Sequence, residues 1–277
     1  MLKRTVIAVL CVVLFASVAL AAPEMTKGAD YKKEGPYTVG FANVWVGNTW
    51  GVQSVGEFEA EALRHPEIKA FYITDAQNNA AKQIADVEDL LAKGIDLLII
   101  QAVSPQAIAP TIEKVAAKGI PVIACVSDKY AASVAALDED FGRVGAEWLV
   151  EQLGGKGNII ILDGMAGITV AENRLKGAKA VFDQYPGIKI VGHEYADWDY
   201  AKGKMATENL LAANPVIGGI WSSGGDMTRG AIEAFVAARR PLVPMTGEDN
   251  NGFLKLWKKY QPDGYKAVGA SMPTYLF

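Results

Sequence analysis

Side chains that could bind a small ligand stand at the ends of several apolar runs in this sequence. They are carboxylates, amides, hydroxyls and indoles. A neutral polyhydroxylated molecule needs this set because each of its hydroxyls both donates and accepts hydrogen bonds, and the flat face of a sugar ring can pack on an indole. The candidate ligand-binding residues are Asn48, Trp50, Ser127, Asp128, Glu172, Trp198, Ser223, Asp249 and Asn250.

Several of these residues also have a purely structural interpretation. A polar residue after a strand often caps the next helix, and this is the alternative for Ser127, Ser223 and Asn250. A position in the hydrophobic core is the alternative for Trp50 and Trp198. Such residues recur at strand ends in both halves of the chain. Taken together, they favour a binding site over the structural interpretation that each residue allows on its own.

The charged candidates separate into two kinds. Asp128 and Asp249 each close an apolar run, and a carboxylate in such a place needs a partner if it is buried. Arg174, near the start of an expected helix, is expected to be a structural ion-pair partner and not a ligand-binding group.

Bond-breaking chemistry has little support in the sequence. The chain has two histidines, of which His65 precedes a proline at a helix end and His193 lies in an alternating strand with a surface face. The usual metalloprotease, redox, nucleophile-elbow and phosphate-loop motifs do not occur in the sequence. Glu172 with Asp128 is the one acid/base pair worth entertaining. We therefore expect a protein that is not an enzyme, with no metal site and no cofactor.

The first 22 residues have the character of a cleavable secretory signal. Two basic residues precede an uncharged apolar run, and small residues follow it at a cleavage site near Ala21 or Ala22. A transmembrane anchor is the alternative, but the run is short for a span and no charged stop-transfer segment follows. We therefore expect export to the periplasm.

Charge and cysteine content narrow the possible partners. The formal charge is −4, and removal of Lys3 and Arg4 with the signal makes it −6, which argues against nucleic acid or an anionic membrane surface as a partner. Cys11 lies inside the signal, so Cys125 would be the one cysteine of the exported chain and no intrachain disulfide could form. Cys125 ends an apolar run, where a buried, unreactive thiol is expected.

Apolar runs alternate with amphipathic stretches through the whole exported chain, and this alternation predicts parallel, doubly wound α/β sheets. The expected strands cover 37–43, 69–75, 95–102, 120–128, 158–164, 188–197, 216–224, 241–249 and 265–272. The expected helices begin near residues 52, 78, 105, 141, 169, 199, 226 and 250.

The pattern restarts after Asp128, which predicts two similar lobes instead of one large sheet. We expect an N-terminal lobe at 37–138 and a C-terminal lobe at 139–271. The region between them has no Pro/Gly-rich linker, so a hinge between packed lobes is expected. Residues 272–277 are expected to begin a crossover back to the N-terminal lobe, with further C-terminal elements missing from the sequence.

The chain resembles the ribose-binding type of periplasmic binding proteins, the type I solute receptors of sugar ABC transporters. The resemblance runs from about Tyr37 to the end. It is carried by the stretches DAQNNAAKQIADVEDLLAKGIDLLII, IPVI before an acidic residue, DGMAG with Arg174 and Gly177, ADWD before KG, GGDMTRGAI and GEDNNG. It implies two α/β lobes joined by three crossovers, with the ligand between them, a permease as partner, and a monomer.

The resemblance also carries roles to particular positions. Asn48 and Trp50 match the family's polar and aromatic pair after the first strand, and Asp128 or Ser127 matches its acidic position after the fourth. In the second lobe, Trp198 matches the family's aromatic residue. Asp249 matches the acidic residue of the family's G-F-D motif, which reads GED here. The departures concern the sugar contacts. Glu172 replaces an arginine, Ser223 and Gly224 fall where the family has an asparagine, and Ser271 replaces a glutamine. These departures predict a pentose other than ribose, a hexose or a sugar alcohol.

The resulting hypothesis is a receptor whose lobes close on a sugar about crossovers near Asp138, Asp249 and Ser271 and then dock on a permease. A sensor that feeds chemotaxis or a regulator is the alternative. A sugar-responsive transcription regulator would share the fold, but it would carry an N-terminal helix-turn-helix and no signal, and residues 1–36 show the reverse. A periplasmic hydrolase is the second alternative.

Overall fold

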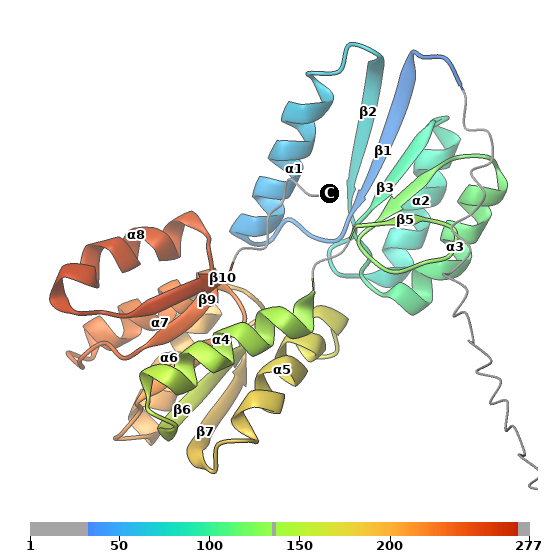
Figure 1. The fold of residues 1–277 in the computed structure, drawn as a ribbon. Helices are drawn as coiled ribbons and strands as arrows, with labels where there is room; N and C mark the ends of the chain where they lie inside the picture. Colours follow the sequence, from blue (N-terminus) through green and yellow to red (C-terminus); the bar gives the residue numbers. More distant parts are fainter. Residues whose placement is uncertain (1–32, 135–136, 271–277) are drawn as a thin grey trace, which may run out of the picture.

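The computed structural model describes residues 33–134 and 137–270. The expected signal at 1–22 and the expected crossover segment at 272–277 lie outside these residues. Within the described ranges, no helix has both the length and the apolar character that crossing a membrane requires. Figure 1 shows two separate α/β units, which we call the N-terminal lobe (β1–β5 with α1–α3) and the C-terminal lobe (β6–β10 with α4–α8).

The N-terminal lobe is built on a five-stranded sheet in the order β2-β1-β3-β4-β5. Every neighbouring pair in this sheet is parallel. Three of the loops that follow these strands start a helix with a side-chain cap: Asn48, Asn79 and Ser104 each accept a backbone N–H of the first turn. The strands are β1 (Tyr37–Asn43), β2 (Ile68–Asp75), β3 (Leu97–Ile100), β4 (Val122–Ala124) and β5 (Ala132–Ser133). The helices are α1 (Thr49–Ala62), α2 (Ala80–Ala92) and α3 (Pro105–Ala117).

The C-terminal lobe repeats the same topology. Its sheet has the order β10-β9-β8-β6-β7, and its neighbouring strands are also parallel. Read from the β7 edge, this order is the same as that of the first sheet, so the predicted pair of similar halves is confirmed. The strands are β6 (Lys156–Asp163), β7 (Gly187–Tyr195), β8 (Gly219–Ser222), β9 (Met245–Glu248) and β10 (Ala267–Ala270). The helices are α4 (Asp138–Gln152), α5 (Thr169–Phe182), α6 (Tyr200–Ala213), α7 (Gly225–Ala237) and α8 (Asn251–Tyr260), and the 3₁₀ helix η1 (Gln261–Asp263) follows α8.

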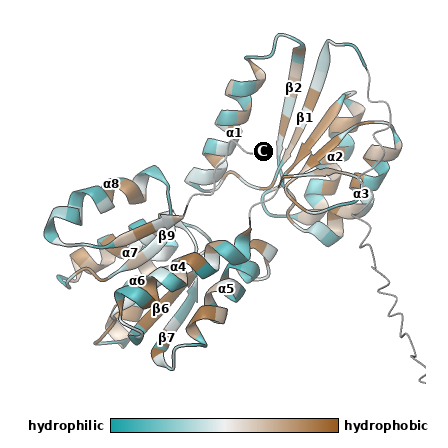
Figure 2. Ribbon diagram, viewed as in Figure 1, coloured by the Kyte–Doolittle hydropathy of each residue, from teal (hydrophilic) through white to brown (hydrophobic). Residues whose placement is uncertain are grey.

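Helices cover both faces of the second sheet, and strand β6 shows why. Ile159 and Ile161 pack in the core beneath α4 and α5, whereas Ile160 and Leu162 pack in the core beneath α6 and α7. All four are at most 1% exposed, so the strand is hydrophobic along its length, as parallel strands buried on both faces are. Figure 2 shows this strand in brown.

Three differences from the sequence-based expectations concern the organisation of the lobes. The two-residue strand β5 extends the first sheet where the sequence predicted only a connection. Helix α4 begins at Asp138, three residues before the expected start at Phe141, because acidic residues in its first turn suit the positive end of the helix dipole. The expected crossover at Asp249 is wrong: β9 leads through α8 to β10, and both strands belong to the second sheet.

Candidate functional site

The carboxyl ends of both sheets border a cleft between the two lobes. In each sheet the strand order reverses next to the second strand, between β1 and β3 in the first sheet and between β6 and β8 in the second, and ligands of open α/β sheets bind outside such switch points. The cleft holds two adjoining cavities, which we call the inner cavity and the outer cavity.

The inner cavity has a volume of about 160 Å³ and a mostly apolar lining. Its N-terminal-lobe wall comes from the residues that follow β1, β2, β3 and β4. Its C-terminal-lobe wall comes from the N-terminal ends of α4 and α5, the loop after β7 and the end of β9. The lining residues are Val44, Trp45, Asn48, Trp50, Asn78, Gln101, Ala102, Cys125, Asp138, Ile168, Val170, Arg174, Trp198 and Glu248.

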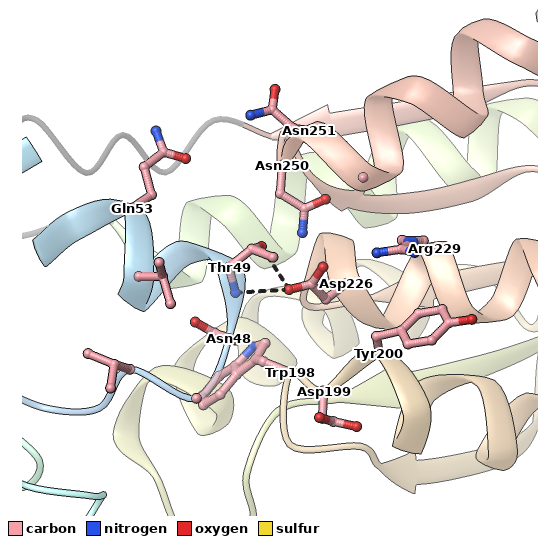
Figure 3. Close-up of a pocket in the computed structure, with 14 residues that line it drawn as sticks. Asn48, Thr49, Gln53, Trp198, Asp199, Tyr200, Asp226, Arg229, Asn250 and Asn251 are labelled. Carbon is pink, nitrogen blue, oxygen red and sulfur yellow. Dashed lines mark hydrogen bonds between the residues drawn. The ribbon is translucent and has the colours of Figure 1, made fainter. Parts of the chain in front are cut away.

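The outer cavity is larger, about 560 Å³, and adjoins the inner one at Asn48 and Trp198, which line both. Figure 3 shows side chains of both lobes around it. Its lining side chains include amide, carboxylate, hydroxyl and guanidinium groups. The lining residues are Val46, Gly47, Asn48, Thr49, Val52, Gln53, Trp198, Asp199, Tyr200, Asp226, Arg229, Asn250, Asn251 and Gly252.

Trp198 is held rigidly at the boundary between the cavities. Its Nε1 donates to the backbone oxygen of Ser223 at 3.1 Å, and its backbone adopts a left-handed conformation with φ of 53°. Two glycines leave room for the ring: a Cβ on Gly164 would lie 2.2 Å from the indole, and one on Gly224 would lie 2.5 Å from it. The indole is therefore fixed before any ligand arrives, which lowers the entropic cost of packing a ring against it.

Two of the cavity-lining asparagines, Asn48 and Asn250, also cap helices. Asn48 Oδ1 accepts from the backbone N–H of Gly51 at 2.8 Å, and Asn250 Oδ1 accepts from that of Phe253 at 3.0 Å. The capping alternative for Asn250 is thus confirmed. Capping occupies only the oxygen of each amide. The two NH₂ groups belong to side chains that line the cavities, where they can donate to a ligand hydroxyl.

Arg174 is the centre of a buried ion-pair cluster beside the inner cavity. Its Nε lies 3.1 Å from Asp138 Oδ1, and its Nη1 lies 2.7 Å from Glu248 Oε1 and 2.6 Å from the carbonyl oxygen of Ser223. Its guanidinium also stacks over Phe141 at 4.2 Å. The expected structural role of Arg174 is therefore confirmed.

The cluster contains two carboxylates but one cation. Burial raises the pKa of Glu248 and of Asp138, and the positive charge of Arg174 offsets only part of this effect. The same two carboxylates raise the pKa of Arg174 despite its burial.

Thr49 joins the two lobes across the outer cavity. Its backbone N–H and its Oγ1 donate to the same oxygen of Asp226, Oδ2, at 3.2 and 2.8 Å. Figure 3 shows this pair of bonds between the start of α1 and the start of α7.

The structure places five of the predicted binding residues outside the lining of both cavities. Asp128 closes a local turn by accepting from the N–H of Tyr130 at 2.7 Å. Ser127, Glu172 and Asp249 are exposed to solvent. Ser223 is fully buried and contributes its backbone oxygen to Arg174 and Trp198, so its side chain does not reach the cleft. Of the nine predicted residues, the cavities bring together Asn48, Trp50, Trp198 and Asn250.

Sequence reasoning missed several cavity residues that carry the same signal. Asn78 and Gln101 follow β2 and β3, so they are strand-end amides like those that were selected. Trp45 lies in the loop between β1 and α1, Trp50 lies in the first turn of α1, and both line the inner cavity. Asp226 had no such signal, because it lies inside the first turn of α7 and not directly after a strand.

The cysteine and the histidines take positions close to those expected. Cys125 is largely shielded, and burial raises the pKa of its thiol to about 11, which keeps it protonated and unreactive at neutral pH. On β7, His193 has its Nε2 3.2 Å from Oδ2 of Asp163, which ends β6, and His65 lies between Glu61 and Glu67 on the surface. Among the residues of 33–134 and 137–270, no three or more His, Cys, Asp or Glu side chains converge on a metal-sized position.

Comparison with known families gives a match over nearly the whole described chain. Residues 39–271 match the model of the periplasmic binding protein domain. The chain belongs to this family. The resemblance to its ribose-binding type, inferred from the sequence motifs, is thereby confirmed.

Individual relatives agree with this assignment. The chain is 28% identical to the ribose import binding protein of Bacillus subtilis over 251 residues, 89% of this chain and 81% of that protein. It is 33% identical to a xylitol-binding protein of Mycolicibacterium smegmatis over 63% of this chain and 51% of that one. The solved arabinose-binding component of an ABC transporter from Shewanella sp. ANA-3 superposes with a TM-score of 0.75 at 27% identity, covering 86% of this chain and 82% of that one. The related proteins are solute-binding proteins, and this fold is that of a two-lobe binding protein.

Proposed function

We propose that this protein captures a sugar or sugar alcohol between its two lobes in the periplasm and delivers it unaltered to the membrane permease of an ABC transporter. The observation that carries the proposal is the pair of indoles, Trp50 from the N-terminal lobe and Trp198 from the C-terminal lobe, on one cavity. A sugar ring or polyol chain between them would touch both lobes, so it would favour the closed arrangement by its differential contacts.

The polar groups beside the indoles suit a neutral ligand. The amides of Asn48, Asn78, Gln101 and Asn250 line the two cavities, and together they offer donors and acceptors to hydroxyls: the NH₂ groups of Asn48 and Asn250 are donors, and Oε1 of Gln101 is an acceptor. The names of the relatives, which include ribose, xylitol and arabinose binding, support the same ligand class.

The organisation of the chain supports transport and capture. We place the signal at 1–22, the N-terminal lobe at 37–138 and the C-terminal lobe at 139–271. Cleavage near Ala21 or Ala22 would release the protein to the periplasm. Asp138 starts α4 and bonds to Arg174 of the second lobe, so the hinge would be anchored directly beside the ligand cavity.

Binding is tested by thermal unfolding of the purified protein with ribose, arabinose, galactose, xylitol and myo-inositol. A ligand at a hundred times its dissociation constant should raise the free energy of unfolding by about 2.7 kcal/mol. The double variant Trp50→Ala, Trp198→Ala should lose this stabilisation. Tyr185→Ala, which removes an exposed aromatic residue outside the cleft, should keep it. The absence of stabilisation by every compound in the panel would overturn the proposal.

Two further measurements separate the receptor from its alternatives. The bound sugar should be recovered chemically unchanged after prolonged incubation, since a hydrolase would convert it. In the host cell, deletion of the gene should abolish uptake of the ligand. Retained uptake together with lost chemotaxis would identify a sensor instead of a transport receptor.

A further inference from the structure

Asp226 is a buried carboxylate with one oxygen in use and one free. The residue is 6% exposed. Its Oδ2 accepts both hydrogen bonds from Thr49, whereas its Oδ1 is shielded and has no hydrogen-bond partner among the residues that the structure describes. The side chain lines the outer cavity. In Figure 3 it lies between Thr49 and Arg229, close to Asn250.

The neighbouring donors make no hydrogen bond to Oδ1 of Asp226. Arg229 Nε lies 3.6 Å from Glu233, and its guanidinium stacks over Tyr200 at 4.5 Å. The oxygen of Asn250 caps α8. Within the described part of the chain, no salt bridge connects Asp226 to a cation. A buried polar atom without a partner costs free energy, and the cost is larger for a charged group.

We propose that Asp226 is a ligand-binding residue, whose Oδ1 accepts a hydroxyl of the ligand while its Oδ2 holds Thr49 of the other lobe. This inference rests on the proposed capture of a sugar or sugar alcohol and extends it to the outer cavity. The ligand hydroxyl would donate a hydrogen bond to Oδ1, which accepts none from the described residues of the protein. One carboxylate would then connect both lobes and the ligand.

The chemistry of this acceptor restricts the ligand. A group that meets Asp226 must be a hydrogen-bond donor, and a negatively charged group would be repelled. The ligand must also extend from the indoles to the start of α7, because Trp198 borders both cavities. We therefore expect neutral polyhydroxylated ligands to bind more tightly than their carboxylate or phosphate derivatives.

The test compares Asp226→Asn with Asp197→Asn, using whichever sugar or polyol of the panel binds the unmodified protein. Asp226→Asn keeps the shape of the side chain, and with its one oxygen facing Thr49 it places an NH₂ group, which cannot accept a hydrogen bond, where Oδ1 lies. Asp197→Asn removes a nearby carboxylate that lines neither cavity, and asparagine tolerates its φ of 53°. Asp226→Asn should weaken binding by about tenfold to a hundredfold, and Asp197→Asn should leave it unchanged.

Ligands that each lack one hydroxyl identify the contact itself. One of these deoxy compounds should bind the unmodified protein more weakly by a similar factor, and it should lose little further affinity in Asp226→Asn, because the interaction is already absent. If both variants bind the parent ligand as tightly as the unmodified protein does, Asp226 is not a binding residue. If the loss in Asp226→Asn is equal for the parent and every deoxy compound, its role is limited to the contact with Thr49. If no compound binds the unmodified protein, it is the proposed function that fails.

Discussion

Arg174 and Trp198 share one acceptor, the backbone oxygen of Ser223, which lies 2.6 Å from Nη1 of the first and 3.1 Å from Nε1 of the second. The carbonyl therefore connects the indole that we propose packs on the ligand to the buried ion-pair cluster at the start of α4. Both donors depend on the loop after β8, where the chain turns into α7. The same backbone oxygen of Ser223 therefore helps to fix the indole of the binding surface and to stabilise the C-terminal lobe.

Replacing Trp198 should separate ring packing from ring positioning. Trp198→Ala removes the apolar face and should weaken sugar binding by about tenfold or more, as losses of buried aromatic anchors do. Trp198→Phe keeps a flat ring but loses the bond to Ser223, so its effect should be smaller. Isothermal titration of both variants measures the two contributions. Equal losses would show that the bond, and not the ring face, decides affinity.

Gly164 should tolerate no side chain. A Cβ at this position would lie 2.2 Å from the Trp198 ring, so Gly164→Ala must displace the indole and weaken binding. Gly56→Ala in α1 is the matched control, since nothing lies within 4 Å of its Cβ position and alanine favours a helix. Titration of both variants with the same ligand makes the comparison. Unchanged affinity in Gly164→Ala would mean that the indole position does not matter.

Loss of the cation in the buried cluster should be costly. Arg174→Met leaves Asp138 and Glu248 buried without their counter-charge, which should lower the free energy of unfolding by about 3–5 kcal/mol. Arg143→Met removes an exposed arginine of α4 that is paired with Asp140 and Glu147, and it should cost about 0–1 kcal/mol. Urea unfolding of the two variants provides the measurement. If the free energy of unfolding falls by a similar amount in both variants, burial of the Arg174 cluster does not make its ion pairs more important than exposed ones.

Glu248 should make stability depend on pH. Because burial raises its folded-state pKa above the usual 4.5, the folded protein holds this proton at a pH where the unfolded chain has released it. The contribution of Glu248 to stability is therefore complete at low pH and is lost as the pH rises from about 4.5 through the folded pKa. In Glu248→Gln this loss disappears, so the stability of the variant relative to the unmodified protein should increase with pH.

The control for this pH profile is Glu147→Gln, which removes an exposed carboxylate of α4 paired with Arg143. Its stability should follow that of the unmodified protein at every pH in urea unfolding. A profile of Glu248→Gln that also runs parallel to the unmodified protein would show that Glu248 has the same pKa in both states.

The sequence was sufficient for the alternation of strands and helices, the repeat of one topology in two lobes, and the structural role of Arg174. These features follow from local patterns: apolar runs such as that of β6 must be covered on both faces, and a parallel strand needs a returning helix. It also identified Asn48, Trp50, Trp198 and Asn250, because polar and aromatic residues directly after a strand lie at the edge where the lobes meet.

Only the tertiary structure decided which of the strand-end residues reach the cleft. Local hydrogen bonding turns Asp128 into its own loop, and the path of the chain leaves Asp249 exposed. The importance of Asp226 could not be recognised from its neighbours in sequence, because its partner Thr49 lies 177 residues earlier and belongs to the other lobe. A contact of this kind depends on how the two lobes pack against each other, and no local pattern of residues encodes that arrangement.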